Sequence, residues 1–227
     1  MVKTHLVRHD ESSASLWHTE AGALAAESGI LFADPWEGVS VESVINYWAS
    51  TPFSLIAIID PELHAVGFGF YREALGKVRV AATLDVKQGL GSLPATVIYP
   101  LPFPHNGGQT WILKTVFSER PQPLTSCPGY ARVTGPPIIL QIGSGDQTPH
   151  VTDHTFRRGE TELEHCIFDE TTYVNPDPAL QERGRLILDQ RDAIVLIPRA
   201  PLEVEQSYTV NIVVNGLPFG WSFIAVR

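Results

Sequence analysis

The chain has 227 residues, of which 44% are hydrophobic and 18% are charged, a composition that indicates a globular protein and excludes a disordered one. Its 25 acidic and 16 basic residues give a formal net charge of -9, and the sequence shows no basic stripe of the kind that binds nucleic acid. It also has no run of about 18 apolar residues, so we predict no membrane-spanning segment.

The first part of the chain carries helical patterns. Residues 19–29 predict a short helix in which Thr19 is the N-cap and Gly29 ends the helix in a left-handed conformation. A second helix is predicted from "SVESVINYWASTP" (40–52), where apolar residues recur at helical spacing and Pro52 prevents continuation. After this proline we expect a short apolar segment and then a strand.

A hairpin follows these helices. The runs "HAVGFGFY" (64–71) and "VRVAATLDV" (78–86) flank a turn at residues 72–77, so we predict two antiparallel strands. Gly67 and Gly69 allow close backbone approach there. Helices followed by a hairpin indicate a small layered α/β unit.

The chain then changes character. Residues 101–135 are dense in Pro and Gly and predict a surface connection. Beyond it the pattern is almost entirely β, with a turn or more of helix in "NPDPALQERG" (175–184). Asn215-Gly216 predicts a type I′ hairpin turn. The predicted strands are 136–142, 162–168, 185–190, 193–198, 207–214 and 219–226, which suggests a β-sandwich of immunoglobulin-like type.

The two cysteines are compatible with two states. Cys127 and Cys166 are separated by 39 positions, and a bridge between them would stabilise the fold by roughly 3 to 4 kcal/mol in the chain-entropy model. Two reduced, buried thiols fit the sequence equally well. His165 and Cys166 are neighbours in an alternating strand, and we expect the cysteine to face the core. The sequence has no CxxC pattern, so it does not favour a cysteine-bound zinc.

Several histidines lie near carboxylates or near one another. His9, Asp10 and Glu11 could hold a metal or position a water, although adjacent residues rarely converge on one ion and a solvated surface is the stronger interpretation. His150 and His154 would share a face only on a helix, and their surroundings predict a loop or strand. The sequence has no GxSxG motif, so an α/β-hydrolase is disfavoured. A Ser/His/Asp triad stays open because only geometry can identify it.

The first half resembles a known family. "RHDE", "WHTEAGALAAESGIL", "VINYWASTPFSLIAIIDPELHAVGFGFY" and "AATLDV" resemble the bacterial branch of the CAP superfamily, which includes cysteine-rich secretory proteins, venom antigens and plant pathogenesis-related proteins. The second half resembles the immunoglobulin-like modules that follow such domains. The expected fold class is therefore α+β. We expect a CAP-like α-β-α sandwich over residues 1–100 with a shortened first helix, the connection over 101–135, and the immunoglobulin-like β-sandwich over 136–227.

The resemblance also implies a site. CAP domains carry two histidines and two acidic residues in a cleft that sometimes binds zinc or another divalent ion. His9 matches the first histidine, but Ser54 falls at the second, Thr51 falls near one acidic position, and residues 30–32 contain no acid where the other would lie. We therefore expect no metal site and no cofactor, with a weakly bound divalent ion left open.

The expected function is binding rather than catalysis. A cleft formed by His9, Glu11, Thr51, Ser54 and His64 would take a small-molecule or cell-envelope ligand, such as a lipid or a glycan. Two alternatives stay open. One is a hydrolase that uses a metal-activated water, or Ser54 as nucleophile and His9 as base with Glu11 or His64 assisting. The other is a purely structural surface module.

The resemblance implies an extracellular or cell-surface location. In such a compartment Cys127 and Cys166 would be oxidised to a disulfide.

Overall fold

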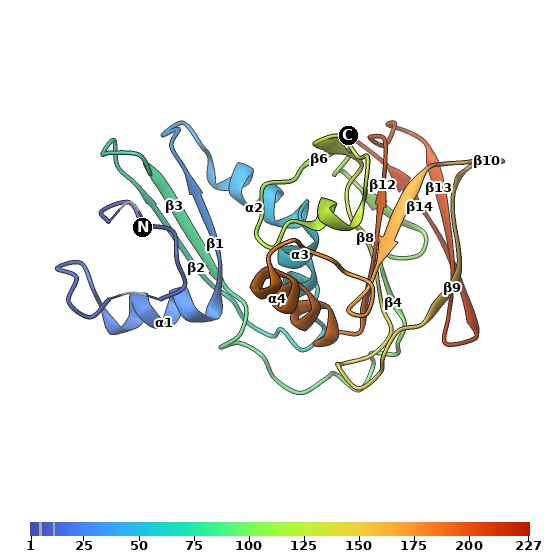
Figure 1. The fold of residues 1–227 in the computed structure, drawn as a ribbon, viewed down its shortest axis with the longest axis horizontal. Helices are drawn as coiled ribbons and strands as arrows, with labels where there is room; N and C mark the ends of the chain where they lie inside the picture. The colour runs from blue at the N-terminus through green and yellow to red at the C-terminus, as the bar shows by residue number, and fades with distance from the viewer. Residues whose placement is uncertain (5, 11) are drawn as a thin grey trace. The chain divides into compact units, whose positions relative to one another are not determined.

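The computed structural model describes residues 1–4, 6–10 and 12–227. It contains helices and several sheets (Figure 1), so the predicted α+β class is confirmed. Contacts divide the chain into two compact units: residues 1–47 with 58–97, and residues 48–57 with 98–227. No helix among the described residues is long and apolar enough to cross a membrane.

The first unit is built on a three-stranded antiparallel sheet. Its order is β1-β3-β2, and its strands are β1 (Gly29–Asp34), β2 (Gly67–Arg72) and β3 (Val80–Asp85). β2 and β3 pair antiparallel from Gly67 opposite Asp85 to Arg72 opposite Val80, so the predicted hairpin is confirmed. β1, which had not been predicted, pairs with the other side of β3.

Helix α1 (Glu20–Ser28) packs against this sheet. The Thr19 hydroxyl accepts a hydrogen bond from the Gly22 N–H at 3.0 Å, as expected of an N-cap. Gly29, however, is extended, with φ -103 and ψ 159, so the predicted left-handed helix end is wrong. A Cβ on Gly29 would lie 2.3 Å from Thr83 Oγ1. The glycine is therefore required by the close approach of strand and helix.

Pro52 separates two consecutive helices. α2 (Val41–Ala49) is confirmed, and the Ser40 hydroxyl caps it by accepting a hydrogen bond from the Ser43 N–H at 3.1 Å. The segment after Pro52, predicted only as an apolar stretch, is helix α3 (Pro52–Ile58). The reason is that proline ends a preceding helix but suits the first turn of the next one, where its missing N–H costs nothing.

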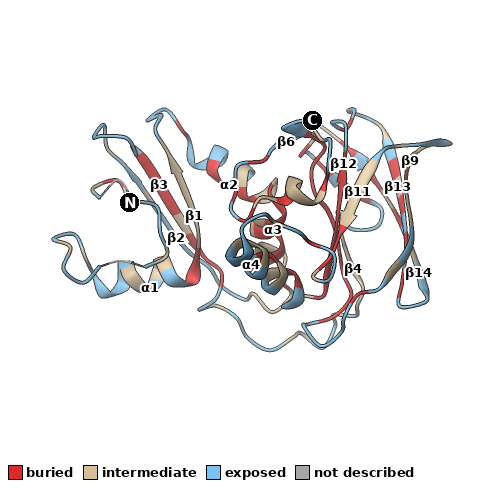
Figure 2. Cartoon of the chain, in the orientation of Figure 1, coloured by how far each residue is buried: buried red, intermediate tan, exposed pale blue. Residues whose placement is uncertain are grey.

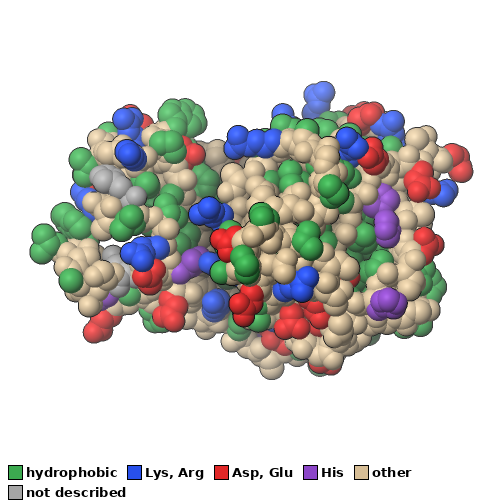
Figure 3. Space-filling model, viewed as in Figure 1, with side chains coloured by type: hydrophobic (Ala, Val, Ile, Leu, Met, Phe, Trp, Pro, Cys, Tyr) green, Lys and Arg blue, Asp and Glu red, His purple; other side chains and the backbone are tan. Residues whose placement is uncertain are grey.

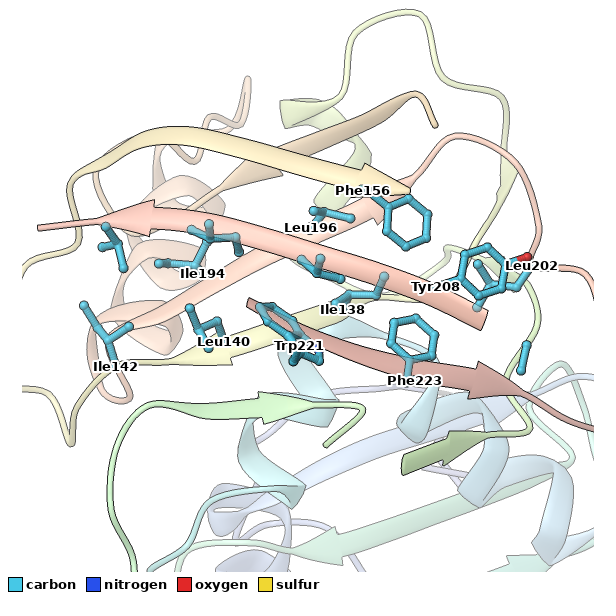
Figure 4. Packing of buried hydrophobic residues seen from close by; sticks show 14 residues of the cluster. Ile138, Leu140, Ile142, Phe156, Ile194, Leu196, Leu202, Tyr208, Trp221 and Phe223 are labelled. Carbon is cyan, nitrogen blue, oxygen red and sulfur yellow. The ribbon is translucent and has the colours of Figure 1, made fainter. Parts of the chain in front are cut away.

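The second unit contains two sheets that pack face to face. One has the order β10-β9-β13-β14-β5 and the other β11-β12-β8-β4. A buried apolar cluster from both sheets fills the space between them (Figure 4), with side chains such as Phe156, Tyr208, Trp221 and Phe223 pointing inward. The strands are β4 (Leu101–Phe103), β5 (Gly108–Thr110), β8 (Ile138–Gln141), β9 (Val151–Arg158), β10 (Thr161–Glu162), β11 (His165–Phe168), β12 (Ala193–Pro198), β13 (Ser207–Val214) and β14 (Leu217–Ala225).

Most predicted strands of this unit are confirmed, as is the hairpin turn, where Asn215 and Gly216 have positive φ values of 52 and 77. The predicted strand at 185–190 is wrong, because that segment belongs to helix α4 (Pro178–Asp189). Asp177 caps α4 by accepting hydrogen bonds from the first N–H groups, and Pro178 occupies the first position. The signals that start this helix, Asp177 and Pro178, lie upstream of residues 185–190.

The other face of the β11-β12-β8-β4 sheet packs against helices. The Phe53 ring of α3 lies 6.4 Å from Phe168 and 5.3 Å from Tyr173, measured between centroids. The remaining short elements are β6 (Thr115–Val116), the 3-10 helix η1 (Pro123–Ser126) and β7 (Val133–Thr134). Cys127, directly after η1, forms a disulfide with Cys166 of β11. The oxidised state is the one the structure contains.

Candidate functional site

The predicted site residues fall in both units. His9 and His64 belong to the first unit and Thr51 and Ser54 to the second. Glu11 lies outside the described residues. The His9 ring is hydrogen-bonded to the Ala26 carbonyl at 2.9 Å through Nδ1. The His64 ring is hydrogen-bonded to the Ser92 carbonyl at 2.9 Å through Nε2. A binding or catalytic role for these side chains stays a prediction.

Thr51 and Ser54 meet at a carboxyl group that sequence reasoning missed. Glu119 is 8% exposed. It accepts hydrogen bonds from the Phe53 backbone N–H and from the Ser54 hydroxyl, each at 3.4 Å. Burial raises the pKa of Glu119 to about 8, because desolvation outweighs the hydrogen bonds from Phe53, Ser54 and Thr51 that favour the ionised form.

This cluster satisfies the start of α3. The first N–H groups of a helix have no partner within the helix, and the Glu119 carboxyl group receives one of them from 66 positions away. The Ser54 hydroxyl is used in the same cluster. The observed geometry therefore gives both Ser54 and Glu119 a role in joining α3 to the segment that follows β6.

A hollow of about 580 Å³ lies over β2 and β3 in the first unit. Gly69, Ala81 and Thr83 share one face of the sheet and form its floor, the backbone at Phe70 and Ala82 adds to the lining, and the aromatic side chains of Trp17 and Tyr71 form part of its wall. Residues 1–4 complete the lining. A volume between about 300 and 1,000 Å³ with mainly apolar walls is typical of small-molecule sites.

Comparison with protein-family models, with curated proteins and with solved structures finds no match. The function is therefore inferred from the structure of the hollow.

One charged group stands at the hollow. The Lys3 ammonium group lies 5.0 Å from the centre of the Trp17 ring and 5.8 Å from that of Tyr71, within the range of cation–π attraction. Lys3 also forms an ion pair with Glu73. The hydrogen bond from Lys3, followed by one from Tyr71, lowers the pKa of Glu73. These contacts hold the amine beside two aromatic rings.

The aromatic wall is accessible. Trp17 is 58% exposed and Tyr71 is 48% exposed, so a ligand could reach both rings without any rearrangement of the sheet.

Among the described residues, no group of three or more His, Cys, Asp or Glu side chains is arranged to hold a metal ion.

The hollow could not be read from the sequence. Its floor depends on Gly69 standing opposite Thr83 and next to Ala81, which requires the register of β2 and β3. "GFGFY" did indicate close approach at the glycines. It did not indicate that the space above them would stay open.

A second hollow of about 490 Å³ lies in the other unit, beside η1. Its lining is Phe117, Ser118, Gln122, Leu124, Thr125, Tyr130 and Arg132. Since it lacks the cluster of exposed aromatic rings, we give the hollow over β2 and β3 more weight.

Proposed function

We propose that this chain is a secreted or cell-surface binding protein whose hollow over β2 and β3 takes an apolar or amphipathic small molecule of the lipid kind. The observation that supports this proposal is a ligand-sized space with a floor of small residues and a wall of accessible aromatic rings. The Lys3 ammonium group would favour a ligand with a polar or anionic head.

The wider context of this proposal is the CAP resemblance. We propose that the first unit is a CAP-like layer and the second an immunoglobulin-like sandwich. The disulfide between Cys127 and Cys166 supports an oxidising, extracellular environment.

The test fills the hollow with a side chain. Gly69 lines it, and a Cβ there would meet only the Thr83 methyl group, at an ordinary 3.5 Å. A leucine at this position can therefore enter the space. Gly67 lies on the same strand and face, its Cβ would also meet a neighbour at 3.5 Å, and it does not line the hollow. Gly67→Leu is the matched control.

The measurement is displacement of a fluorescent fatty acid, followed by native mass spectrometry of bound lipids. We expect Gly69→Leu and Trp17→Ala to abolish uptake and Gly67→Leu to retain it. Equal uptake by Gly69→Leu and the parent protein would refute the site. If a substitution of Leu124 abolished uptake while Gly69→Leu retained it, the ligand would bind in the hollow beside η1 instead.

The same preparation separates binding from hydrolysis. A serine nucleophile would be labelled by a fluorophosphonate probe, and the label would disappear in Ser54→Ala. Since the Ser54 hydroxyl donates its hydrogen bond to the Glu119 carboxyl group, the binding proposal expects no labelling at this residue.

A further inference from the structure

Two histidines come together in the second unit although no sequence pattern paired them. His154 lies on β9 and His165 on β11, and these strands belong to different sheets. Nδ1 of His154 and Nε2 of His165 are 2.8 Å apart. The rings meet edge to face with centroids 4.9 Å apart. Both side chains are partly buried.

A backbone carbonyl fixes the state of one ring. Nδ1 of His165 is hydrogen-bonded to the Leu163 carbonyl at 2.8 Å. A carbonyl only accepts, so this nitrogen carries the proton, and the lone pair on Nε2 of the neutral ring accepts the hydrogen bond from Nδ1 of His154. Histidines that bind metals have the same arrangement, in which the second ring nitrogen donates to a carbonyl or carboxylate and orients the ligating nitrogen.

Leu163, whose carbonyl accepts the hydrogen bond from Nδ1 of His165, is itself held in place. The Leu163 N–H donates to the Phe156 carbonyl at 2.8 Å, and the Phe156 ring lies 6.1 Å from the His165 ring. Phe156 is completely buried in the cluster between the sheets. The lone pair of His165 therefore points from a rigid position toward the side where Nδ1 of His154 now lies and where an ion would have to take its place.

The spacing suits two ligands of one ion. With metal–nitrogen bonds of 2.0–2.1 Å, two imidazole nitrogens in neighbouring coordination positions lie about 2.9 to 3.4 Å apart. The observed 2.8 Å is just below the short end of this range, and coordination requires the His154 ring to turn so that its nitrogen and Nε2 of His165 point at one ion instead of at each other. The carboxylates that act electrostatically on His154 are Asp153 and Glu162. Glu162 is also paired with Arg157 at 3.3 Å.

We propose that His154 and His165 form a two-imidazole site for a borderline divalent transition ion of the Zn²⁺ or Ni²⁺ kind. His165 binds through Nε2. His154 binds through Nδ1 after its proton is exchanged through water to Nε2, so both rings stay neutral. The other coordination positions are filled by water, and the ion joins the two sheets at this edge. Imidazole nitrogen favours such ions over Mg²⁺ and Ca²⁺, which prefer oxygen.

This site differs from the one implied by the family resemblance, which would lie around His9. It also differs from the pair His150 and His154 considered from the sequence. His150 is exposed, and its backbone N–H is bonded to the Asn215 side chain at 2.9 Å. His150 is therefore the matched control, being a nearby histidine in the same unit that is not part of the pair.

The experiment is calorimetric titration of the full, disulfide-bonded chain with ZnCl₂ after removal of metals by a chelator. We expect one ion per chain, with affinity reduced about tenfold or more in His154→Gln and in His165→Gln, because each removes one of two ligands. His150→Gln and His9→Gln should bind as the parent does, and MgCl₂ should give no heat of binding.

A second measurement covers variants that fold poorly. In the parent protein, NMR of the imidazole nitrogens should show zinc-dependent shifts for two rings, assigned to His154 and His165 by the single variants. The proposal is overturned if the parent binds no zinc, if His9→Gln or His150→Gln loses binding, or if the shifted rings are not this pair.

Discussion

The two units bury their sheets to different degrees. The inner strands are buried in both units, with all six residues of β12 and five of the six residues of β3, but the edge strand β2 of the first unit is exposed at five of its six residues. Figure 2 shows the buried residues of β3 and β12 in red. The second unit also has a continuous cluster of buried apolar side chains between its sheets.

This contrast has a chemical origin. In the second unit aromatic rings fill the space between sheets, with Tyr208 stacked between Phe156 and Phe223 at centroid distances of 5.4 and 5.6 Å. In the first unit Gly69 and Ala81 stand where larger side chains would fill the space over this face of the sheet, and a hollow remains. We infer that the second unit contributes most of the stability. The first unit is packed less densely and exposes an apolar surface.

The charged side chains on the visible face do not indicate a partner of one particular charge. Figure 3 shows basic and acidic side chains interspersed there. Recognition by the first unit should therefore depend on apolar and aromatic contacts more than on a charged patch.

The strongest test of the comparison substitutes one phenylalanine in each unit. Phe156 is fully buried and Phe68 of β2 is 44% exposed. We expect Phe156→Ala to lower the free energy of unfolding by about 3 to 5 kcal/mol, and Phe68→Ala by less than about 1 kcal/mol. Urea unfolding followed by circular dichroism measures both. Equal losses would show that the first unit is packed as tightly as the second.

The disulfide provides the next largest effect. It closes a loop of 39 positions within the second unit, so Cys127→Ala combined with Cys166→Ala should cost about 3 to 4 kcal/mol. Hydrogen exchange measured by mass spectrometry can localise the loss. We expect reduced protection in β8 and β12 and unchanged protection in β3. A loss confined to β3 would contradict the assignment of stability to the second unit.

The elements that could be predicted are those with local signals. The Ser40 cap defined the start of α2, and Asn215-Gly216 defined the last hairpin. The segment 185–190 failed because a short apolar run fits a strand and a helix almost equally. Its assignment depended on Asp177 and Pro178, which begin the helix upstream.

The sites depended on contacts between distant segments. Glu119 meets Ser54 across 65 positions, and His154 meets His165 from another sheet. Neither pair has a spacing that a helix or a strand would impose. The family resemblance drew attention to Ser54, but the sequence could not identify the carboxyl group to which its hydroxyl donates.

Glu119 makes the stability of the second unit depend on pH between about 4.5 and 8. Its pKa is about 8 in the fold and 4.5 in the reference state, so the folded protein holds this proton more tightly than the unfolded chain. The contribution to stability is therefore complete below pH 4.5 and is lost as pH rises to about 8. The expected loss is a few kcal/mol. Glu119→Gln keeps a hydrogen-bonding group without the titration.

The measurement compares the two proteins by urea unfolding at several pH values. The difference in unfolding free energy between parent and Glu119→Gln should change across this window and be constant above it. A difference that does not vary with pH would mean that Glu119 is ionised in the fold, held by the N–H groups at the start of α3.

The smallest effect comes from adding one methyl group to a glycine in each unit. A Cβ on Gly184 of α4 would lie 2.4 Å from the ring of Tyr173, which is fully buried, whereas a Cβ on Gly67 of β2 meets its nearest neighbour at 3.5 Å. Alanine normally stabilises a helix relative to glycine by about 1 kcal/mol. We nevertheless expect Gly184→Ala to destabilise the protein by about 1 to 2 kcal/mol, because the close-packed Tyr173 ring must move. Gly67→Ala should change stability by less than about 0.5 kcal/mol. Thermal unfolding of both variants measures these changes. A Gly184→Ala variant more stable than the parent would mean that the side chains around α4 in the second unit can move aside as easily as those on the open sheet of the first.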